Sequence, residues 1–336
     1  MAFVTIRDIA QEAGVSVTAV SQILHDKGRF SQQTRELVRQ TAERLGYVPD
    51  QRARAMRSAA TQTVGLLVPD LRNPYFADMV SSMEEELYRR GFTTLIGSYG
   101  ERVDRQDAFL RSLLGQRIDG AIVVPQGGLS QGLQLLIERK LPLVFVDRLV
   151  PGAENVPFVV SDPKPGLEEA LERLAGLGHR AIGFVSHSAL GSFSVNERAK
   201  AFSAAIRERI PGGTGVVVDC NSTVESRSSA LERLNNAGVT AIICAYSPDA
   251  ITMLGLLQER GIAIGDAVSL ISFDDIEAFR LMVPQVSVIS QQADAMGRLG
   301  VEMLIRRIAS GTEVAAHTHY VPTVLHMRGS CGVAVV

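Results

Sequence analysis

Short apolar runs alternate with amphipathic stretches from Thr63 onward, and this rhythm limits the possible folds more than any other feature of the sequence. Short β-branched runs bounded by Pro, Gly and Asp are typical of strands buried on both faces of a parallel sheet. The rhythm starts again after Ser161-Asp162, so the sequence predicts two similar α/β halves in succession. The runs cover residues 64–68, 93–96, 121–124, 143–146, 181–185, 216–218, 241–244 and 270–273.

Three short helices are predicted before Gly46. Thr5, Ser16 and Ser31 stand where N-caps are needed, and Gly14 and Gly46 stand where the first and third helices should end. The tight turn after the first helix sets the first two helices at a steep angle. Residues spaced along one face of each helix form one small core: Ile6, Ile9, Ala10, Ala13, Val20, Ile23, Leu24, Leu37, Val38, Thr41, Ala42 and Leu45.

Charge is distributed unevenly, although the net charge is only −2. Residues 1–60 hold nine lysines and arginines against six acidic residues, whereas the remainder holds 25 against 30. This asymmetry is expected if only the small N-terminal unit approaches phosphates. From helix spacing alone, however, a generic three-helix lobe fits as well as a DNA-binding head.

Composition narrows the class of protein. A chain of 336 residues fits two or three folded units, and its 46% hydrophobic content allows most of it to be buried. The three cysteines lack CxxC spacing, and no basic start is followed by an apolar run, which is typical of a reduced cytoplasmic protein. No stretch approaches the ~18 apolar residues of a membrane span.

Polar and aromatic residues gather at the carboxyl ends of the predicted strands, where open parallel sheets bind ligands. Asn73-Pro74-Tyr75-Phe76 follows the first strand, Asp147-Arg148 follows the fourth, and Asp274-Asp275 follows the run at 270–273. Gln291 follows a further run, and Arg198 lies on a predicted helix. Taken singly, each residue is more often an ordinary loop residue. Together, carboxylates, guanidinium groups and amides beside an aromatic face are the usual chemistry for holding a sugar.

Three segments, Asp8 to Gly14, Val15 to Gln22 and Tyr47 to Arg57, resemble the lactose/galactose repressor (LacI/GalR) family. The likeness extends over nearly the whole chain. It implies an all-α helix-turn-helix DNA-binding head plus an α/β two-lobed periplasmic-binding-protein-like effector domain.

The resemblance also implies which residues of the head contact DNA. The second helix would lie in the major groove, with Val17, Thr18 and Gln22 at base edges. Many relatives carry arginine where this chain has Gln22, and glutamine pairs best with adenine, so we expect an adenine at that step. The alternative is that Gln22 touches only phosphate or solvent. Four further residues would contact the phosphate backbone: Thr5, Arg7, Ser16 and Ser21.

After Pro49, a segment of eight residues would form a hinge helix only when DNA and a second subunit support it. Asp50 would cap it, and Ala53 would let two such helices approach closely. Met56 would be the apolar wedge between base steps, and three arginines would face phosphates: Arg52, Arg54 and Arg57. The alternative is an ordinary polar linker.

For the body, the likeness extends to periplasmic ribose-binding proteins and to ribose-type members of the family. It implies an effector site made of Asn73, Tyr75, Phe76, Asp147, Arg148, Arg198, Asp274 and Gln291. Asp249-Ala250 stands where relatives show Asn-Asp, and we include Asp249 in the site. The effector expected is a pentose or a nucleoside, although Arg148 and Arg198 would equally suit an anionic sugar phosphate.

The predicted organisation has five parts. They are a helix-turn-helix domain (1–48), a hinge helix and linker (49–60), an N-terminal lobe (61–161 and 291–325), a C-terminal lobe (162–290) and a C-terminal tail (326–336). The predicted function is that of a homodimeric repressor on a pseudo-palindromic operator, controlled by a small-molecule effector, with no cofactor and no membrane partner. The sign of the response is open, with induction preferred.

Two rival functions are an α/β enzyme acting on a sugar and a periplasmic-type sugar receptor. The sequence has no Gly-rich dinucleotide loop, P-loop or nucleophile elbow, which disfavours the enzyme. His317 and His319 on a predicted strand are a weak metal signal, and we predict no metal site. A receptor would need an export signal, whereas this chain begins with a predicted DNA-binding head.

Overall fold

The computed structural model describes residues 4–48, 60–310 and 317–335. The chain forms two compact units, Met1–Thr61 and Gln62–Val336, which we call the head and the body.

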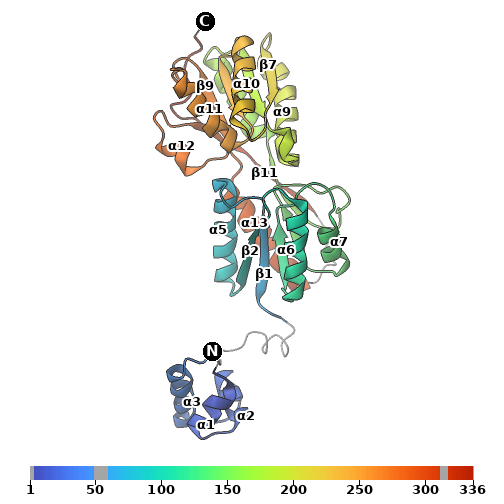
Figure 1. The fold of residues 1–336 in the computed structure, drawn as a ribbon, viewed down its shortest axis with the longest axis vertical. Coiled ribbons are helices and arrows are strands. Elements are labelled where there is room, and N and C mark those ends of the chain that lie inside the picture. The colour runs from blue at the N-terminus through green and yellow to red at the C-terminus, as the bar shows by residue number, and fades with distance from the viewer. Residues whose placement is uncertain (1–3, 49–59, 311–316, 336) are drawn as a thin grey trace. The chain divides into compact units, whose positions relative to one another are not determined.

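The head is a three-helix domain (Figure 1) made of α1 (Ile6–Ala13), α2 (Val17–Leu24) and α3 (Gln32–Arg44). Thr5, Ser16 and Ser31 cap these helices as predicted, because each side-chain oxygen accepts a backbone N–H of the first turn. Gly14 ends α1 with a left-handed φ of 65°. The core holds Ile9, Ala10, Ala13, Val20, Ile23, Val38, Thr41 and Ala42.

The core prediction for Leu37 is wrong, because its side chain is 48% exposed. Neighbouring residues of an α-helix point about 100° apart. Since Val38 faces the core, Leu37 turns away from it.

The first lobe of the body is built on a parallel six-stranded sheet in the order β11-β5-β4-β3-β1-β2. Five of these strands come from the first part of the body, and β11 arrives from near the C-terminus. The strands are β1 (Thr63–Val68), β2 (Thr93–Ser98), β3 (Gly120–Val123), β4 (Leu143–Val146), β5 (Phe158–Asp162) and β11 (Thr318–Pro322).

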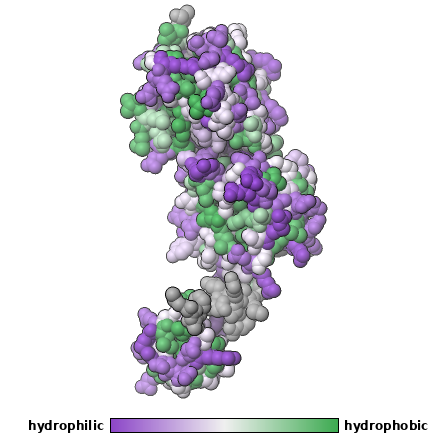
Figure 2. Space-filling model, viewed as in Figure 1, coloured by the Kyte–Doolittle hydropathy of each residue, from purple (hydrophilic) through white to green (hydrophobic). Residues whose placement is uncertain are grey.

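Helices cover both faces of this sheet. The helices α5 (Pro74–Arg89) and α13 (Ala293–Ser310) lie on one face, and α6 (Val103–Gly115) and α7 (Gln131–Glu138) lie on the other (Figure 1). Successive strand residues alternate between the two cores, as Val144 and Phe145 do. Hydrophilic side chains cover most of the surface visible in Figure 2, with smaller apolar patches between them.

The second lobe repeats the plan with a sheet in the order β12-β10-β9-β8-β6-β7. Its strands are β6 (Ala181–Ser186), β7 (Thr214–Asp219), β8 (Ala241–Cys244), β9 (Ser269–Phe273), β10 (Ser287–Ser290) and β12 (Val324–His326). Helices α8 (Lys164–Gly176) and α9 (Phe193–Arg209) pack on one face, and α10 (Val224–Asn236) and α11 (Ser247–Glu259) pack on the other. Two short helices complete the lobe, η1 (Ser188–Leu190) and α12 (Glu277–Leu281).

The predicted boundary at residue 325 is wrong, because β12 pairs antiparallel with β10 of the second lobe. The following segment is also part of that lobe. The Ser330 hydroxyl donates to the Leu270 carbonyl at 2.6 Å, and the Ala334 N–H donates to the Leu177 carbonyl at 2.9 Å. The edge strand β10 would otherwise leave backbone groups without partners, and β12 supplies them.

In the described part of the chain, the backbone crosses between the lobes three times. The crossings follow β5, β10 and β11, and they lie side by side. The Thr323 N–H donates to the Asp162 carbonyl at 3.1 Å, and the Gln292 amide donates to the Pro322 carbonyl at 2.6 Å. The three crossings therefore form one hydrogen-bonded ribbon.

Candidate functional site

The head presents the predicted contact residues at its surface. Along α2, Val17, Thr18 and Gln22 are exposed, while Val20 and Ile23 are buried. One face of the helix is therefore available to a groove while the opposite face is held by the core. The backbone-contact candidates Thr5, Arg7 and Ser16 are exposed, and Ser21 is half-buried.

Local bonds hold the two caps in place. Thr5 and Asp8 form a capping box in which the Thr5 N–H donates to the Asp8 carboxylate at 2.7 Å. This bond and a second one from the Thr5 hydroxyl lower the pKa of Asp8 below its ordinary value. The Ser16 hydroxyl oxygen accepts the Ala19 N–H at 3.1 Å.

Two exposed basic residues that were not predicted as contacts, Lys27 and Arg29, lie in the loop that follows α2. Gly28 between them has a φ of 75°, and a Cβ there would lie 2.7 Å from the amide oxygen of Gln22. The signal that could have found this loop is the pair of basic residues flanking a glycine. The predicted hinge contacts lie outside the described residues: Asp50, Arg52, Ala53, Arg54, Met56 and Arg57.

A cleft lies at the carboxyl ends of the strands in the body. The space between its lining atoms, counted together with the open solvent at its mouth, is about 280 Å³. Eight of the nine predicted effector residues line it, and they come from both lobes: Asn73, Tyr75, Phe76, Asp147, Arg148, Arg198, Asp274 and Gln291.

Two aspartates occupy equivalent and unusual backbone positions. Asp147 follows β4 and Asp274 follows β9, and each has a left-handed φ of 69°. Such a conformation costs an L-residue of this kind on the order of 1–3 kcal/mol and is often found at binding sites. The fold therefore holds a carboxylate at the end of a strand in each lobe.

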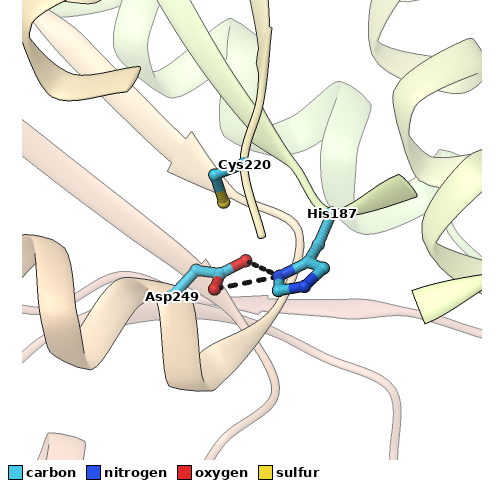
Figure 3. A group of neighbouring side chains, drawn as sticks. All are labelled: His187, Cys220 and Asp249. Atoms are coloured by element: carbon cyan, nitrogen blue, oxygen red, sulfur yellow. Dashed lines mark hydrogen bonds and ion pairs between the residues drawn. The ribbon is translucent and has the colours of Figure 1, made fainter. Parts of the chain in front are cut away.

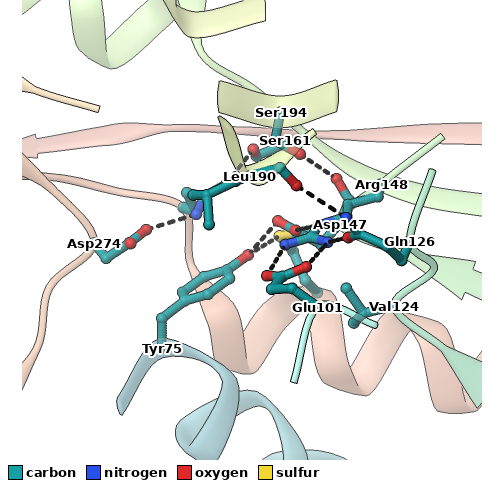
Figure 4. A network of polar contacts seen from close by, with 12 residues as sticks. Tyr75, Glu101, Val124, Gln126, Asp147, Arg148, Ser161, Leu190, Ser194 and Asp274 are labelled. Atoms are coloured by element: carbon teal, nitrogen blue, oxygen red, sulfur yellow. Dashed lines mark hydrogen bonds and ion pairs between the residues drawn. The ribbon is translucent and has the colours of Figure 1, made fainter. Parts of the chain in front are cut away.

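In the first lobe, the Tyr75 hydroxyl donates to Asp147 at 2.9 Å. Arg148 is bound at both ends of its guanidinium group by the Glu101 carboxylate, with two N···O distances of 2.8 Å (Figure 4). Burial opposes the charge of Arg148, but the Glu101 bonds outweigh it and raise its pKa above the ordinary value. The Arg148 side chain also donates to the amide oxygen of Gln126 at 2.5 Å.

In the second lobe, the Asp274 carboxylate accepts bonds from Gln291 at 2.6 Å and from Ser247 at 3.1 Å. Burial nevertheless raises its pKa above the ordinary value. Arg198 donates from one terminal nitrogen to the Ala245 carbonyl at 2.5 Å, and its guanidinium group lies 4.5 Å from the Phe273 ring centroid.

Three of the residues lining the cleft carry a buried nitrogen without a hydrogen-bond partner among the described residues. They are the Asn73 amide nitrogen and the Nε atoms of Arg148 and Arg198. An unsatisfied buried donor costs about 1–3 kcal/mol, so three in one cleft need an explanation. Oxygen atoms of a bound ligand would satisfy all three.

The two lobes also bond to each other around the cleft. The Ser194 hydroxyl of the second lobe donates to the Asp147 carbonyl of the first. From the first lobe, the Gln126 amide donates to the Leu190 carbonyl at 3.0 Å (Figure 4). Two residues that line the cleft, Asp147 and Leu190, therefore take part in bonds between the lobes, and these bonds form only when the lobes are close together.

The prediction for Asp249 does not fit the geometry, because Asp249 is not among the residues that line the cleft. Its carboxylate is fully buried and accepts bonds from Arg227 at 2.8 Å and from the His187 Nδ1 at 2.9 Å. Its position in the first turn of α11 directs the side chain toward α10 rather than the cleft.

His187, Cys220 and Asp249 form the one group among the described residues with donor atoms close enough for a metal ion, within 4.8 Å of one another (Figure 3). Arg227 already balances the charge of Asp249. Burial raises the pKa of the Cys220 thiol to about 12, which keeps it protonated and a poor ligand. We therefore interpret the group as a closed ion-pair cluster.

Four residues that line the cleft were missed: Leu190, Ser192, Val195 and Tyr246. Tyr246 comes two residues after β8, so the strand-end argument applies to it as well. Leu190, Ser192 and Val195 precede Arg198 along η1 and the start of α9. They follow the end of β6 at Ser186, so the strand-end argument applies to them as well.

Two family models match the two units of the chain. Residues 5–50 match bacterial regulatory proteins of the lacI family, and residues 171–331 match a periplasmic binding protein-like domain. The chain therefore combines a LacI-family DNA-binding domain with a periplasmic-binding-protein-like domain, and the relatives that match it over most of their length include transcriptional repressors. No helix among the described residues has the length and hydrophobicity needed to cross a membrane.

Relatives match along most of the chain. The HTH-type transcriptional repressor PurR of Vibrio atlanticus (strain LGP32) is 27% identical over 311 residues, covering 90% of this chain and 92% of that protein. Catabolite control protein A of Priestia megaterium is 26% identical over 306 residues, with the same two coverages. The Lac repressor dimer bound to operator and the anti-inducer ONPF has the same fold. Its TM-score is 0.82 at 22% identity, covering 98% of this chain and 99% of that one.

Proposed function

We propose that this chain is a DNA-binding repressor that works as a homodimer on a pseudo-palindromic operator. An uncharged pentose or nucleoside bound in the cleft would control its affinity for the operator. The observation that carries the effector class is a set of three donors without a partner among the described residues, which line the same cleft as two aspartates. Hydroxyl groups both accept and donate hydrogen bonds, so a polyol can satisfy both kinds of group at once. Its place of action would be the cytoplasm, where the DNA lies.

Two aromatic side chains favour a ring-shaped ligand. Tyr75 and Phe76 lie in the cleft with ring centroids 5.0 Å apart and planes at 63°. Apolar ring surface packs against the C–H faces of a sugar or against a base, while the polar groups hold its hydroxyls. Of the two, the pentose is the smaller ligand and would require the cleft to open less.

Coupling to DNA would follow from lobe closure. A ligand held by Asp147 from one lobe and by Asp274 and Arg198 from the other binds the closed arrangement more tightly than an open one. Closure would change how the first lobes of the two subunits face each other. The relative position of the two hinge segments would change as well. We favour release from DNA as the response.

Isothermal titration of the full chain tests the effector class. The ligands are ribose, purine and pyrimidine nucleosides, and the phosphate ester of each. We expect saturable binding of an uncharged pentose or nucleoside, and loss of that binding in Asp147→Asn. Binding only to a free purine base or an amino acid would reject the proposal.

Selection of bound sequences from a random DNA pool tests the operator proposal. The selected sites should be two-fold symmetric, and binding should weaken steeply as salt rises. Gln22→Arg should shift one symmetric position from adenine toward guanine, whereas Gln33→Arg, an equally exposed control in α3, should not. An unchanged preference at every position would show that Gln22 contacts no base.

For the hinge, the proposal rests on the sequence. Met56→Ala should weaken operator binding, because an apolar wedge is lost, and should leave effector binding unchanged. Equal operator affinity for the two proteins in a shift assay would contradict the wedge.

A further inference from the structure

Among the described residues, Glu101 is the one acidic residue that contacts Arg148 with both of its carboxylate oxygens, and it was not predicted from the sequence. It follows β2, whereas Arg148 follows β4. Both terminal nitrogens of Arg148 lie 2.8 Å from Glu101 oxygens. The Arg148 side chain is 5% exposed and that of Glu101 is 25% exposed, so the ion pair is largely shielded from solvent.

This pairing decides what Arg148 can offer a ligand. Arginine binds phosphate best through two parallel N–H groups. Here Glu101 holds one terminal nitrogen, and Glu101 and Gln126 share the other. The Nε–H, 3.7 Å from Asp147, and the second N–H of the other terminal nitrogen are left for a ligand. Glu101 therefore occupies one of the two parallel N–H pairs of Arg148 and balances its charge, so a phosphate group would meet a guanidinium that is already neutralised.

Arg198 carries the other positive charge at the cleft, with one terminal nitrogen bound to the Ala245 carbonyl and its flat face on Phe273. The lining of the cleft holds two carboxyl groups, Asp147 and Asp274, and two guanidinium groups, Arg148 and Arg198. Glu101, which is bonded to Arg148, adds a third carboxylate to this balance. An anionic ligand would enter a site that already has an excess of negative charge, and like charges in such a site are strongly unfavourable.

We propose that Glu101 is a specificity-determining residue that reserves the cleft for uncharged effectors by neutralising Arg148 before the ligand arrives. The proposal rests on the proposed function of the cleft as the effector site. It predicts that removing one charge, with the shape of the side chain kept, opens the site to phosphate esters.

The test compares the wild-type chain with Glu101→Gln by isothermal titration and by thermal shift. The probes are ribose, ribose 5-phosphate and inorganic phosphate. We expect the affinity ratio of ribose 5-phosphate to ribose to rise at least about tenfold in Glu101→Gln, since a repulsive charge is removed and Arg148 is freed. Inorganic phosphate should raise the melting temperature of this variant and leave the wild-type protein unchanged.

Two control variants separate charge from shape. Glu138→Gln removes an exposed carboxylate at the C-terminal end of α7 and should leave the ratio unchanged. Glu101→Asp keeps the charge and should keep the preference for ribose. If Glu101→Gln does not fold, Glu101→Ala supplies a second neutral variant for the same ratio. An unchanged ratio in the neutral variant, or an equal rise in Glu101→Asp, would overturn the proposal.

Failure of the proposed function is distinguishable from failure of this inference. If the wild-type protein bound neither pentoses nor nucleosides, the effector class would fall. The inorganic phosphate comparison would still report on Glu101, because it requires no sugar. Phosphate binding to the wild-type protein as strong as to Glu101→Gln would reject the role of Glu101 by itself.

Discussion

Each lobe of the body contains a buried arginine paired with a carboxylate near the carboxyl ends of its strands, but the two pairs differ in completeness. In the second lobe, Arg227 and His187 satisfy Asp249 entirely within the protein. In the first lobe, Glu101 satisfies the two ends of Arg148 and leaves its Nε atom open toward the cleft. A pair with every group satisfied stabilises the fold, whereas a pair with an open donor can also bind a ligand.

The largest expected effect comes from breaking the closed pair. Asp249→Ala leaves Arg227 buried without its partner, and such a loss lowers the free energy of unfolding by about 3–5 kcal/mol. Urea denaturation of the body measures it. The matched control is Glu232→Ala in the same lobe, whose pair with Arg260 is more exposed and should contribute less than about 1 kcal/mol. Equal effects of the two variants would contradict the closed-pair interpretation.

Replacing Arg148 or Arg227 with methionine tests whether the first pair serves ligand binding and the second serves stability. Arg148→Met removes a charged donor that we assign to the ligand and should weaken effector binding about 10- to 100-fold. Its effect on stability should be smaller than that of Arg227→Met, because Glu101 can turn to solvent while Asp249 cannot. Titration and urea denaturation of both variants give the comparison. The reverse order of effects would show that the two pairs have been assigned the wrong roles.

The pH dependence of stability compares the two strand-end aspartates. The pKa of Asp274 is raised by burial, so the folded state disfavours its ionised form. Asp274 therefore destabilises the empty protein above its folded pKa. This penalty decreases as pH falls below that value and is absent below the ordinary pKa that the group has in the unfolded chain. Asp274→Asn should raise the free energy of unfolding at neutral pH by about 0.5–2 kcal/mol, with less gain at lower pH. A gain that does not change with pH would exclude the burial explanation.

The smallest expected effect concerns Cys220. Because its thiol is buried and protonated, Cys220→Ser should change stability by less than about 1 kcal/mol. Zinc added to either protein should leave the melting temperature unchanged. A zinc-dependent rise in the wild-type protein that is lost in Cys220→Ser would show that the cluster in Figure 3 is an open metal site.

The fold could be predicted from the sequence because apolar runs and helix caps act locally. All eight apolar runs fall on strands, and the three caps of the head are where they were predicted. The segment at β12 was assigned to the wrong lobe, because its pairing with β10 bridges residues far apart in the chain.

The site was only partly predictable for the same reason. Residues placed directly after a strand, such as Asp147 and Asp274, follow a positional rule. Asp249 lies on a helical turn, where one residue more or less changes the direction of the side chain by about 100°. Glu101 also follows a strand, β2, but its pairing with Arg148 spans 47 residues of sequence and joins the ends of two strands that are not neighbours in the sheet, so the pairing could not be predicted.

The ribbon of three crossings limits how the two lobes can move. Because the three connections lie side by side and are joined by hydrogen bonds, we expect them to bend together about one hinge axis. They would resist sliding or twisting of one lobe relative to the other. A ligand of a different size would then change mainly one quantity, the opening angle. Ligands of increasing size should therefore produce increasing opening angles between the two lobes. The protein would in this way convert the size of the bound ligand into an angle.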